Sequence, residues 1–548
     1  MKKVKLVAAA LLLSSAAGAQ TIYEASGLID SDLNGTARYV GMGGAMNALG
    51  GDVSVMRSNP AGIGLYRSND LVFSFGTNTA STSPGTGNDK FRKTSFSFDN
   101  AAFVYAFDMG KSPVRFLNFG FNYNKRRNFN RQWRGNWSDG TTQTDLIASM
   151  ASSGITADGL PGYDPEQFEA ADAFVTANPY VGWLPIMGYA AYLINPVTDQ
   201  AGNFNGKWGR YSPADSFNHV YDMQESGWIN DYDFNVSLNV YDRVYLGMTL
   251  TAIDVKYQKS STYTEEIYAF DKKNPDKIYY QGGYDLMNTF STSGSGLGFS
   301  IGIIARLTDN LRLGFSFATP TIYWLRDYQE STLSFDVDVM DENGQWVARR
   351  GAILPEDEYR NFMGYEYNYR VRTPWKVNVS LGATLLSRLA IGAEYEYQNA
   401  AKTSIMYEDG INIDVLNDGY TGDDGILFGG VRQSFGAQHV AKVGGEFRVT
   451  PSFSVRAGFN YVTSFMEATA FKYMEASSAR TDTEYENVRD RWSVSAGLGY
   501  SKNHFYFDLA YQFMKYNSDF YPYYDVNIPA IGLQNREHQA LLSVGFRF

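Results

Sequence analysis

The residues best suited to catalysis are few in this chain. Its 548 residues include four histidines and no cysteine. A Ser–His–acid hydrolase needs the three groups assembled in one site. The chain has a G-x-S-x-G match around Ser300, but it lies within an alternating, strand-like segment and not at a strand-to-helix turn. The lack of cysteine excludes disulfides, thiolate zinc sites and cysteine nucleophiles. We therefore expect no catalytic residue, no metal site and no cofactor. The histidines are His219, His439, His504 and His538.

The N-terminus carries the features of a secretory signal peptide. Lys2, Lys3 and Lys5 precede an apolar stretch at 6–13, and Ala17-Gly18-Ala19 forms an A-x-A cleavage site. We expect residues 1–19 to be removed and the mature chain to begin at Gln20. After this point no apolar run reaches the roughly 18 residues that a membrane-spanning helix needs. The net charge of −11 argues against nucleic acid as a partner.

The last eleven residues alternate between two kinds of side chain. Leu542, Val544, Phe546 and Phe548 share one face of a strand, and small or polar residues occupy the other. Similar alternation recurs throughout the chain, which is rich in aromatic residues (16%) and contains 53 glycines. Strands with a lipid-compatible face and a small polar face are typical of a transmembrane β-barrel. A secreted soluble β-protein is the alternative. The other segments are 117–123, 244–250, 297–303, 389–397, 453–461, 492–501 and 505–513.

The connections between these segments come in two lengths, which predicts the topology. Short turns belong on the periplasmic side of such barrels and long loops outside. Pairing them gives about fourteen antiparallel strands with both chain ends in the periplasm. The expected short turns lie at 109–113, 241–242, 308–310, 387–388, 450–451 and 502–503.

The longest connection, about residues 135–217, contains its own apolar segments. Asp164, Pro165 and Gln167 form a helix-start pattern. The apolar residues that follow suggest two alternatives. The loop could pack a small core of its own, or it could expose an apolar capture site for a hydrophobic ligand. The candidate capture residues are Phe168, Phe174, Val175, Tyr180, Trp183, Leu184, Ile186 and Met187.

A glycine-rich segment, residues 20–69, precedes the first alternating strand. It contains the pairs Gly43-Gly44 and Gly50-Gly51, and later Asn59-Pro60-Ala61-Gly62. Glycine allows the backbone to turn tightly and to approach other chain closely. The pairs do not form a phosphate-binding loop, because no Gly-Lys-Ser/Thr follows them at the spacing that such a loop requires. We expect Asn59 to hydrogen-bond the backbone of the barrel lumen and Pro60 to fix a turn.

This segment resembles the N-terminal hatch of the FadL-type family of outer-membrane channels for long-chain fatty acids and aromatic hydrocarbons. The resemblance rests on residues 41–45, residues 48–52 and, above all, the Asn-Pro-Ala motif at 59–61. It implies an all-β fold, in which a fourteen-stranded barrel (70–548) is plugged by a hatch (20–69). The implied hatch residues are Gly41, Gly43, Gly44, Gly51, Asp52, Asn59, Pro60, Ala61 and Gly62.

The family also implies a function, namely passive uptake across the outer membrane of a Gram-negative bacterium. A hydrophobic ligand would be captured by outer loops, pass beside the hatch and leave sideways into membrane lipid. Long-chain fatty acids are the first expectation. Small aromatic hydrocarbons, or a structural or adhesive role, are the alternatives. The terminal Phe548 resembles the signal through which the C-terminal strand engages the barrel assembly machinery.

Two places could provide the sideways exit. Pro320 and Pro374 interrupt otherwise convincing strands, and proline donates no hydrogen bond to a sheet. The family instead implies a kink in the third strand, where Gly120 is the obvious weak point. We expect the third strand to be the exit, because the two prolines could simply lie at bulges near the outer rim.

Overall fold

The computed structural model describes most of the chain. The described residues are 22–85, 90–154, 182–211, 214, 216–271, 274–340, 345–353, 365–407, 431–474, 476, 478 and 480–548. The predicted signal peptide lies outside them.

The described residues form one closed antiparallel barrel of fourteen spans, as the turn pattern predicted. It closes because β1 (Asp70–Pro84) pairs with β21 (Ile531–Arg547). Three spans are each made of two strands that continue one another: β10 (Leu311–Ala318) with β11 (Ile322–Met340), β14 (Lys376–Leu385) with β13 (Tyr365–Arg372), and β15 (Leu389–Asn399) with β16 (Ser404–Tyr407). The other spans are β2 (Phe91–Asp108), β3 (Val114–Asn128), β7 (Ser216–Val240), β8 (Val244–Asp271), β9 (Asn274–Arg306), β17 (Ala437–Arg448), β18 (Phe453–Val462), β19 (Tyr485–Lys502) and β20 (Phe505–Tyr521).

The alternation of side chains sorts the two faces of this wall. Met248 on β8 is 52% exposed, whereas the neighbouring Thr249 is completely buried. Phe299 and Ser300 on β9 are sorted in the same way. Apolar side chains therefore cover the outside of the barrel, as lipid requires, and small polar side chains face the lumen. No helix among the described residues is long and apolar enough to span a membrane.

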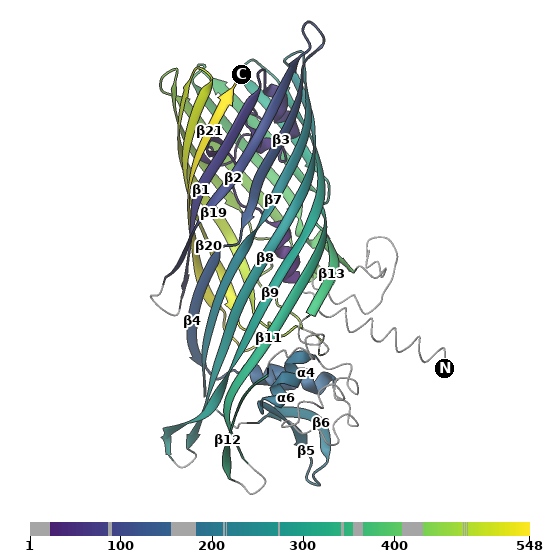
Figure 1. Ribbon diagram of the computed structural model, residues 1–548, viewed down its shortest axis with the longest axis vertical. Coiled ribbons are helices and arrows are strands. Elements are labelled where there is room, and N and C mark those ends of the chain that lie inside the picture. Colours follow the sequence, from purple (N-terminus) through teal and green to yellow (C-terminus); the bar gives the residue numbers. More distant parts are fainter. Residues whose placement is uncertain are drawn as a thin grey trace, which may run out of the picture.

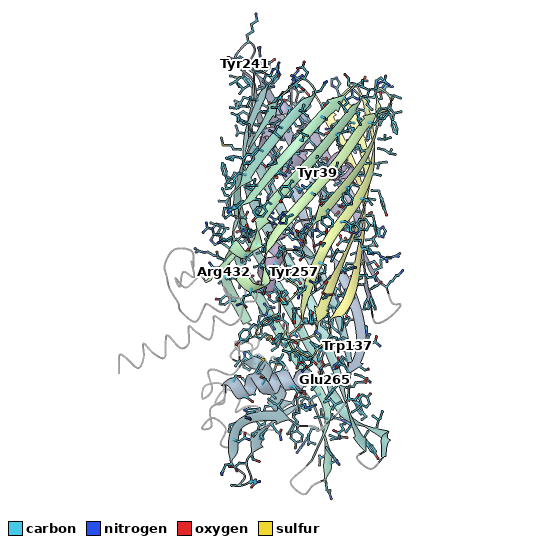
Figure 2. The ribbon with its side chains drawn as sticks, turned by 180° about the vertical axis from the view of Figure 1, so that it is seen from behind. Tyr39, Trp137, Tyr241, Tyr257, Glu265 and Arg432 are labelled. Carbon is cyan, nitrogen blue, oxygen red and sulfur yellow. The ribbon has the colours of Figure 1, made fainter. Side chains whose placement is uncertain are left out.

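The two ends of the barrel differ. One end carries the short turns, for example Tyr241-Asp242 and Leu386-Ser387, whose positive φ angles suit two-residue hairpins. The C-terminus lies at this end (Figure 1). Tyr241 marks the same end in Figure 2, while Trp137 and Glu265 lie toward the opposite end. The short-turn end corresponds to the predicted periplasmic side.

At the outer end, several strands continue well past the barrel as a sheet that we call the blade. It consists of the ends of β7, β8, β9 and β11 together with β4 (Arg131–Asp139) and β12 (Trp346–Ile353). Beside the blade lie α4 (Gln143–Gly154), α6 (Trp183–Ala190) and the hairpin of β5 (Ile194–Thr198) and β6 (Phe204–Arg210) (Figure 1). A large apolar cluster joins these helices to the blade.

The N-terminal segment lies inside the barrel (Figure 1). It contains α2 (Ile22–Ile29), α3 (Ala37–Gly41) and the short 3₁₀ turns η1 (Val53–Val55) and η2 (Pro60–Leu65). α2 lies toward the outer end, and residues near η2 pack against β7, β8 and β9. The segment therefore runs along the lumen from its outer to its periplasmic part.

Candidate functional site

The wall accommodates the N-terminal segment through glycines that face the lumen. A side chain at Gly444 would collide with the carbonyl oxygen of Met42, and one at Gly392 with that of Ala45. Gly458 lies in the same way against Gly43. Because these contacts leave no room for a Cβ, the glycines of the lumen face define where the segment can lie.

The glycines of the segment itself meet a different need. Gly43, Gly44 and Gly51 have φ between +63° and +78°, the left-handed region that other residues rarely adopt. Gly41 lies close to the wall: a Cβ atom at this position would be 3.3 Å from the Cα of Gly497. Asp52 caps η1 by accepting from the Ser54 amide, and its carboxylate also accepts from the Thr36 hydroxyl.

The Asn-Pro-Ala motif makes its hydrogen bonds differently from our expectation. Asn59 donates to the carbonyl of Asn47 at 3.0 Å and accepts from the Ala61 amide, so its side chain bonds within the segment and not to lumen backbone. Pro60 begins η2 as its first residue, as the motif predicted. Ala61 and Gly62 are buried in the same turn.

The anchoring bonds run in the opposite direction, from wall side chains to carbonyls of the segment. Asn235 donates to Pro60 at 3.2 Å, and Asn118 donates to Ile63 at 2.7 Å. Thr249 donates to Met56 at 2.6 Å. The polar lumen face therefore supplies donors to the backbone of this part of the segment.

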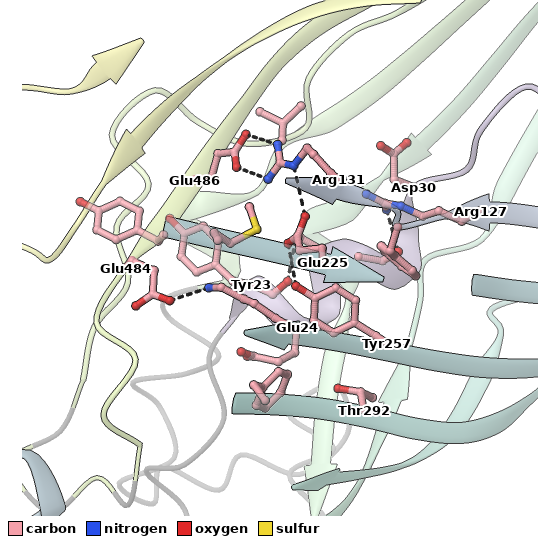
Figure 3. A pocket seen from close by; sticks show the side chains of 18 of the residues that line it. Tyr23, Glu24, Asp30, Arg127, Arg131, Glu225, Tyr257, Thr292, Glu484 and Glu486 are labelled. Carbon is pink, nitrogen blue, oxygen red and sulfur yellow. Dashed lines mark hydrogen bonds and ion pairs between the residues drawn. The ribbon is translucent and has the colours of Figure 1, made fainter. Parts of the chain in front are cut away.

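A chamber of about 250 Å³ lies at the outer end of the segment (Figure 3). α2 forms one side, and β3, β4 and the long strands β7 and β8 form another. The described part of the loop 463–484, which we call the inner loop, folds in and contributes Lys472, Arg480 and Asp482. Elements from three distant parts of the sequence therefore enclose the chamber.

Ion pairs dominate one part of the chamber lining (Figure 3). Arg131 lies between Glu225 at 3.2 Å and Glu486 at 2.5 Å. Lys259 contacts Glu484 at 2.7 Å. Buried charges need such partners because leaving them unpaired in a low-dielectric interior costs several kcal/mol.

A second ion-pair cluster joins the inner loop to α2. Arg480 contacts Glu24 of α2 and Asp482, both at 2.5 Å, and Lys472 contacts Asp482 at 2.8 Å. Burial alone would raise the pKa of Asp482, but Arg480 and Lys472 hold it well below its ordinary value. These ion pairs connect the inner loop to α2, at the outer end of the N-terminal segment.

The outer end of the chamber is aromatic. Trp133 on β4 packs edge-on against Phe520 with ring centroids 4.7 Å apart, and Tyr221 lies 4.6 Å from the same ring. Phe290 on β9 adds another aromatic side chain, over which the Arg480 guanidinium lies at 4.3 Å. The chamber can therefore contact both an apolar and a polar part of one molecule.

The described capture residues, which lie on α6, are mostly buried. Phe168, Phe174, Val175 and Tyr180 lie outside the described residues. Leu184, Ile186 and Met187 on α6 are at most 2% exposed and pack into the apolar cluster shared with α4 and the blade, with Trp183 partly buried against it. The prediction of an exposed capture site is wrong for these three buried side chains, because the loop packs a core of its own, which was the alternative.

The third strand shows no interruption at Gly120. This residue is paired on both sides, with Val104 of β2 and Asn235 of β7. Met56 of the N-terminal segment fills the space that a Cβ at Gly120 would need. The backbone ladder at Gly120 is continuous, in contrast to the expected kink.

The two prolines, in contrast, mark a real interruption. Pro320 lies between β10 and β11, and Pro374 lies between β13 and β14. Thr321 and Thr373 bridge the two breaks, since the Thr373 amide donates to the Thr321 carbonyl at 3.0 Å. The next span is interrupted by the turn η4 (Ala400–Lys402), which separates β15 from β16. Three neighbouring spans are therefore interrupted at one level.

Helix α2 covers this interrupted wall from inside. Ala25 and Leu28 pack in one cluster with residues of β11, β13 and β16, and Ile22 and Ile29 pack in another with Ala400 of η4. The same helix lines the chamber on its other side. One helix thus separates the chamber from the interrupted spans.

The histidines do not assemble a catalytic site. His219 is buried in the blade, with Nδ1 2.9 Å from the Tyr263 hydroxyl and Nε2 3.2 Å from Asp139. The others bond tyrosine hydroxyls or backbone on the barrel. Among the described residues, no group of acids and histidines could hold a metal ion.

Solved structures with a similar fold are known, although no family model matches the chain and no curated protein matches its sequence. A FadL homologue from Pseudomonas aeruginosa matches with a TM-score of 0.51 at 12% identity, covering 94% of this chain and 99% of that one. Likeness at this identity shows the fold, so the chain has a FadL-type barrel, as the Asn-Pro-Ala motif and strand pattern predicted.

Two toluene transporters also match. They are TodX from Pseudomonas putida, with a TM-score of 0.44 at 12% identity, and TbuX from Ralstonia pickettii, with a TM-score of 0.42 at 11% identity. Each match covers 94% of this chain and 99% of the transporter.

The sequence did not reveal the inner loop or the chamber lining. The charges of the lining come from segments hundreds of residues apart, such as Glu24 and Arg480. One signal was present, namely the density of charged residues from Arg480 to Arg491, directly before the alternation of β19 begins.

Proposed function

We propose that this chain is an outer-membrane channel for the passive uptake of hydrophobic small molecules, with long-chain fatty acids as the first class. The observation that carries the proposal is the chamber, since the N-terminal segment fills the lumen below it and leaves an enclosed space with an aromatic end. An open porin would have a continuous water-filled lumen instead. Residues 1–19 would be the signal peptide, 20–69 the hatch and 70–548 the barrel.

Capture is proposed to begin on the outer part of the molecule. Because Leu184, Ile186 and Met187 are buried, the exposed apolar side chains of the blade are better placed. Ile278, Tyr280 and Trp346 are each at least half exposed there. From the blade, a ligand would reach the chamber and pass α2. Uptake by this route would be passive, without coupling to an energy source.

Release is proposed to occur sideways, through the interrupted spans next to Pro320 and Pro374 and not at Gly120. Strands without a continuous ladder separate at lower cost, because fewer backbone hydrogen bonds must break. The outside of this wall faces lipid, with Phe315 and Val379 both exposed. The other proposed partners are this lipid and, during biogenesis, the barrel assembly machinery acting on β21.

Uptake in cells tests the proposal. A deletion strain should accumulate radiolabelled oleate several-fold more slowly than the wild type, and a plasmid copy should restore the rate. Labelled toluene tests the alternative substrate class in the same strains. Wild-type rates for both tracers in the deletion strain would contradict transport of these classes and favour a structural or adhesive role.

A further inference from the structure

The charges that line the chamber are not all paired. Three side chains, Arg127, Asp32 and Glu537, have no oppositely charged partner within 4 Å among the described residues, in contrast to the ion pairs around Arg131, Lys259 and Arg480. Unpaired charges that face a cavity are the groups available to a ligand. Their signs therefore indicate what the ligand carries.

Arg127 provides a positive group with free donors. Its Nη1 donates to the Gly27 carbonyl of α2 at 2.7 Å, and its guanidinium lies 4.9 Å from the centre of the Phe129 ring. A guanidinium has five N–H donors in a planar fork, which suits a carboxylate or phosphate. Stacking on Phe129 orients this fork before any ligand arrives.

Asp32 and Glu537 provide the acidic groups, and the hydrogen bonds that their carboxyl oxygens accept come from neutral donors. The Asn128 amide donates to Asp32 at 3.0 Å, and the Asn78 side chain donates to Glu537 at 3.4 Å. Both carboxylates also line a crevice of about 20 Å³ that adjoins the chamber. This volume holds about one water-sized group.

The crevice has the lining of a cation site. Besides Asp32 and Glu537 it contains Asp99 and the side-chain amides of Asn34, Gln512 and Gln539, and no lysine or arginine lines it. Amide and carboxylate oxygens are acceptors for the N–H groups of an ammonium. A single primary ammonium would therefore fit its size and its charge.

The aromatic end of the chamber lies well away from these charges. Met514 on β20 pairs with Glu537, and Phe520 lies six residues further along the same strand. At a rise of roughly 3.3 Å per residue, the two ends are about 20 Å apart. The chamber is therefore long enough to hold a charged head at one end and an apolar tail at the other.

We propose that the ligand of this chamber is a long-chain amphiphile with a zwitterionic head. The ammonium would occupy the crevice beside Asp32 and Glu537, the carboxylate or phosphate would bind Arg127, and the tail would lie toward Trp133 and Phe520. A simple fatty acid satisfies Arg127 but leaves both carboxylates without a cation. A hydrocarbon satisfies none of the three and displaces the water that solvates them. This inference rests on the proposed function, whose substrate class it narrows.

Three probes of equal chain length test the inference on the full-length protein in lipid nanodiscs. They are 2-aminotetradecanoate, tetradecanoate and tetradecylamine, titrated calorimetrically. We expect 2-aminotetradecanoate to bind at least tenfold more tightly than either single-charge probe. Glu537→Gln, with Asp32→Asn as a second variant, should remove most of this advantage over tetradecanoate. Arg127→Gln should weaken both acids about tenfold and leave tetradecylamine unchanged. Glu266→Gln, on the blade away from the chamber, is the control.

The outcomes separate the inference from the proposed function. The zwitterion assignment is wrong if tetradecanoate or tetradecylamine binds within twofold of 2-aminotetradecanoate, or if neither Glu537→Gln nor Asp32→Asn changes the preference. In those cases oleate uptake in cells can still be normal, and the channel function stands. If none of the probes binds and the deletion strain takes up oleate at the wild-type rate, both claims fail.

Discussion

At the scale of single residues, glycines without a Cβ and asparagine side chains together shape the lumen around the N-terminal segment. Gly392, Gly444 and Gly458 lack the Cβ that would displace the N-terminal segment, while Asn118 and Asn235 reach across to its carbonyls. The sequence shows these residues as the small polar face of alternating strands. It does not show which of them touch the segment, because that depends on the register between elements that meet only in the folded barrel.

Two adjacent glycines provide a matched test of this packing. A methyl at Gly444 would collide with the Met42 carbonyl, whereas one at Gly445 would have only the Ala390 oxygen near it, at 3.8 Å. We expect Gly444→Ala to shift the segment, at a cost of about 1–3 kcal/mol for overpacking, and to raise single-channel conductance in planar bilayers. Gly445→Ala should behave as the wild type. Equal conductance of both variants and wild type would show that the contact does not position the segment.

Asp482 provides a pH-dependent contact at the same scale. Its pKa is held below the ordinary value by Arg480 and Lys472. The stability it contributes is therefore present above the unfolded pKa of about 3.9 and is lost as the pH falls below it. We expect hydrogen exchange in the inner loop to accelerate between pH 5 and pH 3, after correction for the intrinsic rate.

Asp482→Asn should produce a similar loss of protection at pH 7, since it leaves buried cations without their carboxylate, at a cost of about 3 kcal/mol. Asp309→Asn serves as the control, because the Arg306–Asp309 pair lies on a short turn with Asp309 80% exposed. Protection that stays constant from pH 7 to pH 3 would argue against this role for the cluster.

At the scale of elements, prolines were informative and a glycine was misleading. Pro320 and Pro374 had to lie where a ladder is broken, because proline has no amide hydrogen to donate. Gly120 needs no break, since a glycine in a paired strand can equally serve to admit a neighbouring side chain, here Met56. What no local pattern showed is that η4 interrupts the next span at the same level and that α2 lies behind all three.

Disulfide clamps can distinguish the two exits, because the chain has no cysteine of its own. Thr321→Cys with Thr373→Cys would join the bridged spans across the proline break. Ala102→Cys with Asn122→Cys would join β2 to β3 beside Gly120, where these residues are register partners. We expect the oxidised first pair to reduce oleate uptake at least fivefold, with recovery on reduction, and the second pair to leave it unchanged. The reverse pattern would place the exit at the third strand.

At the scale of the whole molecule, the two faces of the barrel wall meet two different environments. Lipid outside and a polar lumen inside impose alternation on every span, and this signal is local enough to predict the strands, the short turns and the fourteen spans. The outer loops obey no such rule. The Gly182 and Trp183 amides of α6 donate to carbonyls of the inner loop, hundreds of residues away, and the inner loop in turn contacts Glu24. Such contacts depend on three-dimensional packing that sequence periodicity does not encode.

The plug assignment makes a prediction for the molecule as a whole. Most residues of the N-terminal segment are buried, and the wall that surrounds it is paired around its full circumference. Deletion of residues 20–56, with the signal peptide retained, should therefore leave a folded barrel, because the backbone ladders of the wall run from strand to strand and include no residue of the segment. We expect this variant to remain strand-rich by circular dichroism and heat-modifiable on gels, and to conduct ions several-fold better than the wild type. Replacing Asn59 with leucine should cause a smaller increase, because it removes the bonds to Asn47 and Ala61 without removing the segment. A deleted variant that folds but conducts as the wild type would mean that the segment does not obstruct the lumen, and the remaining barrel wall and inner loop would then have to be the barrier.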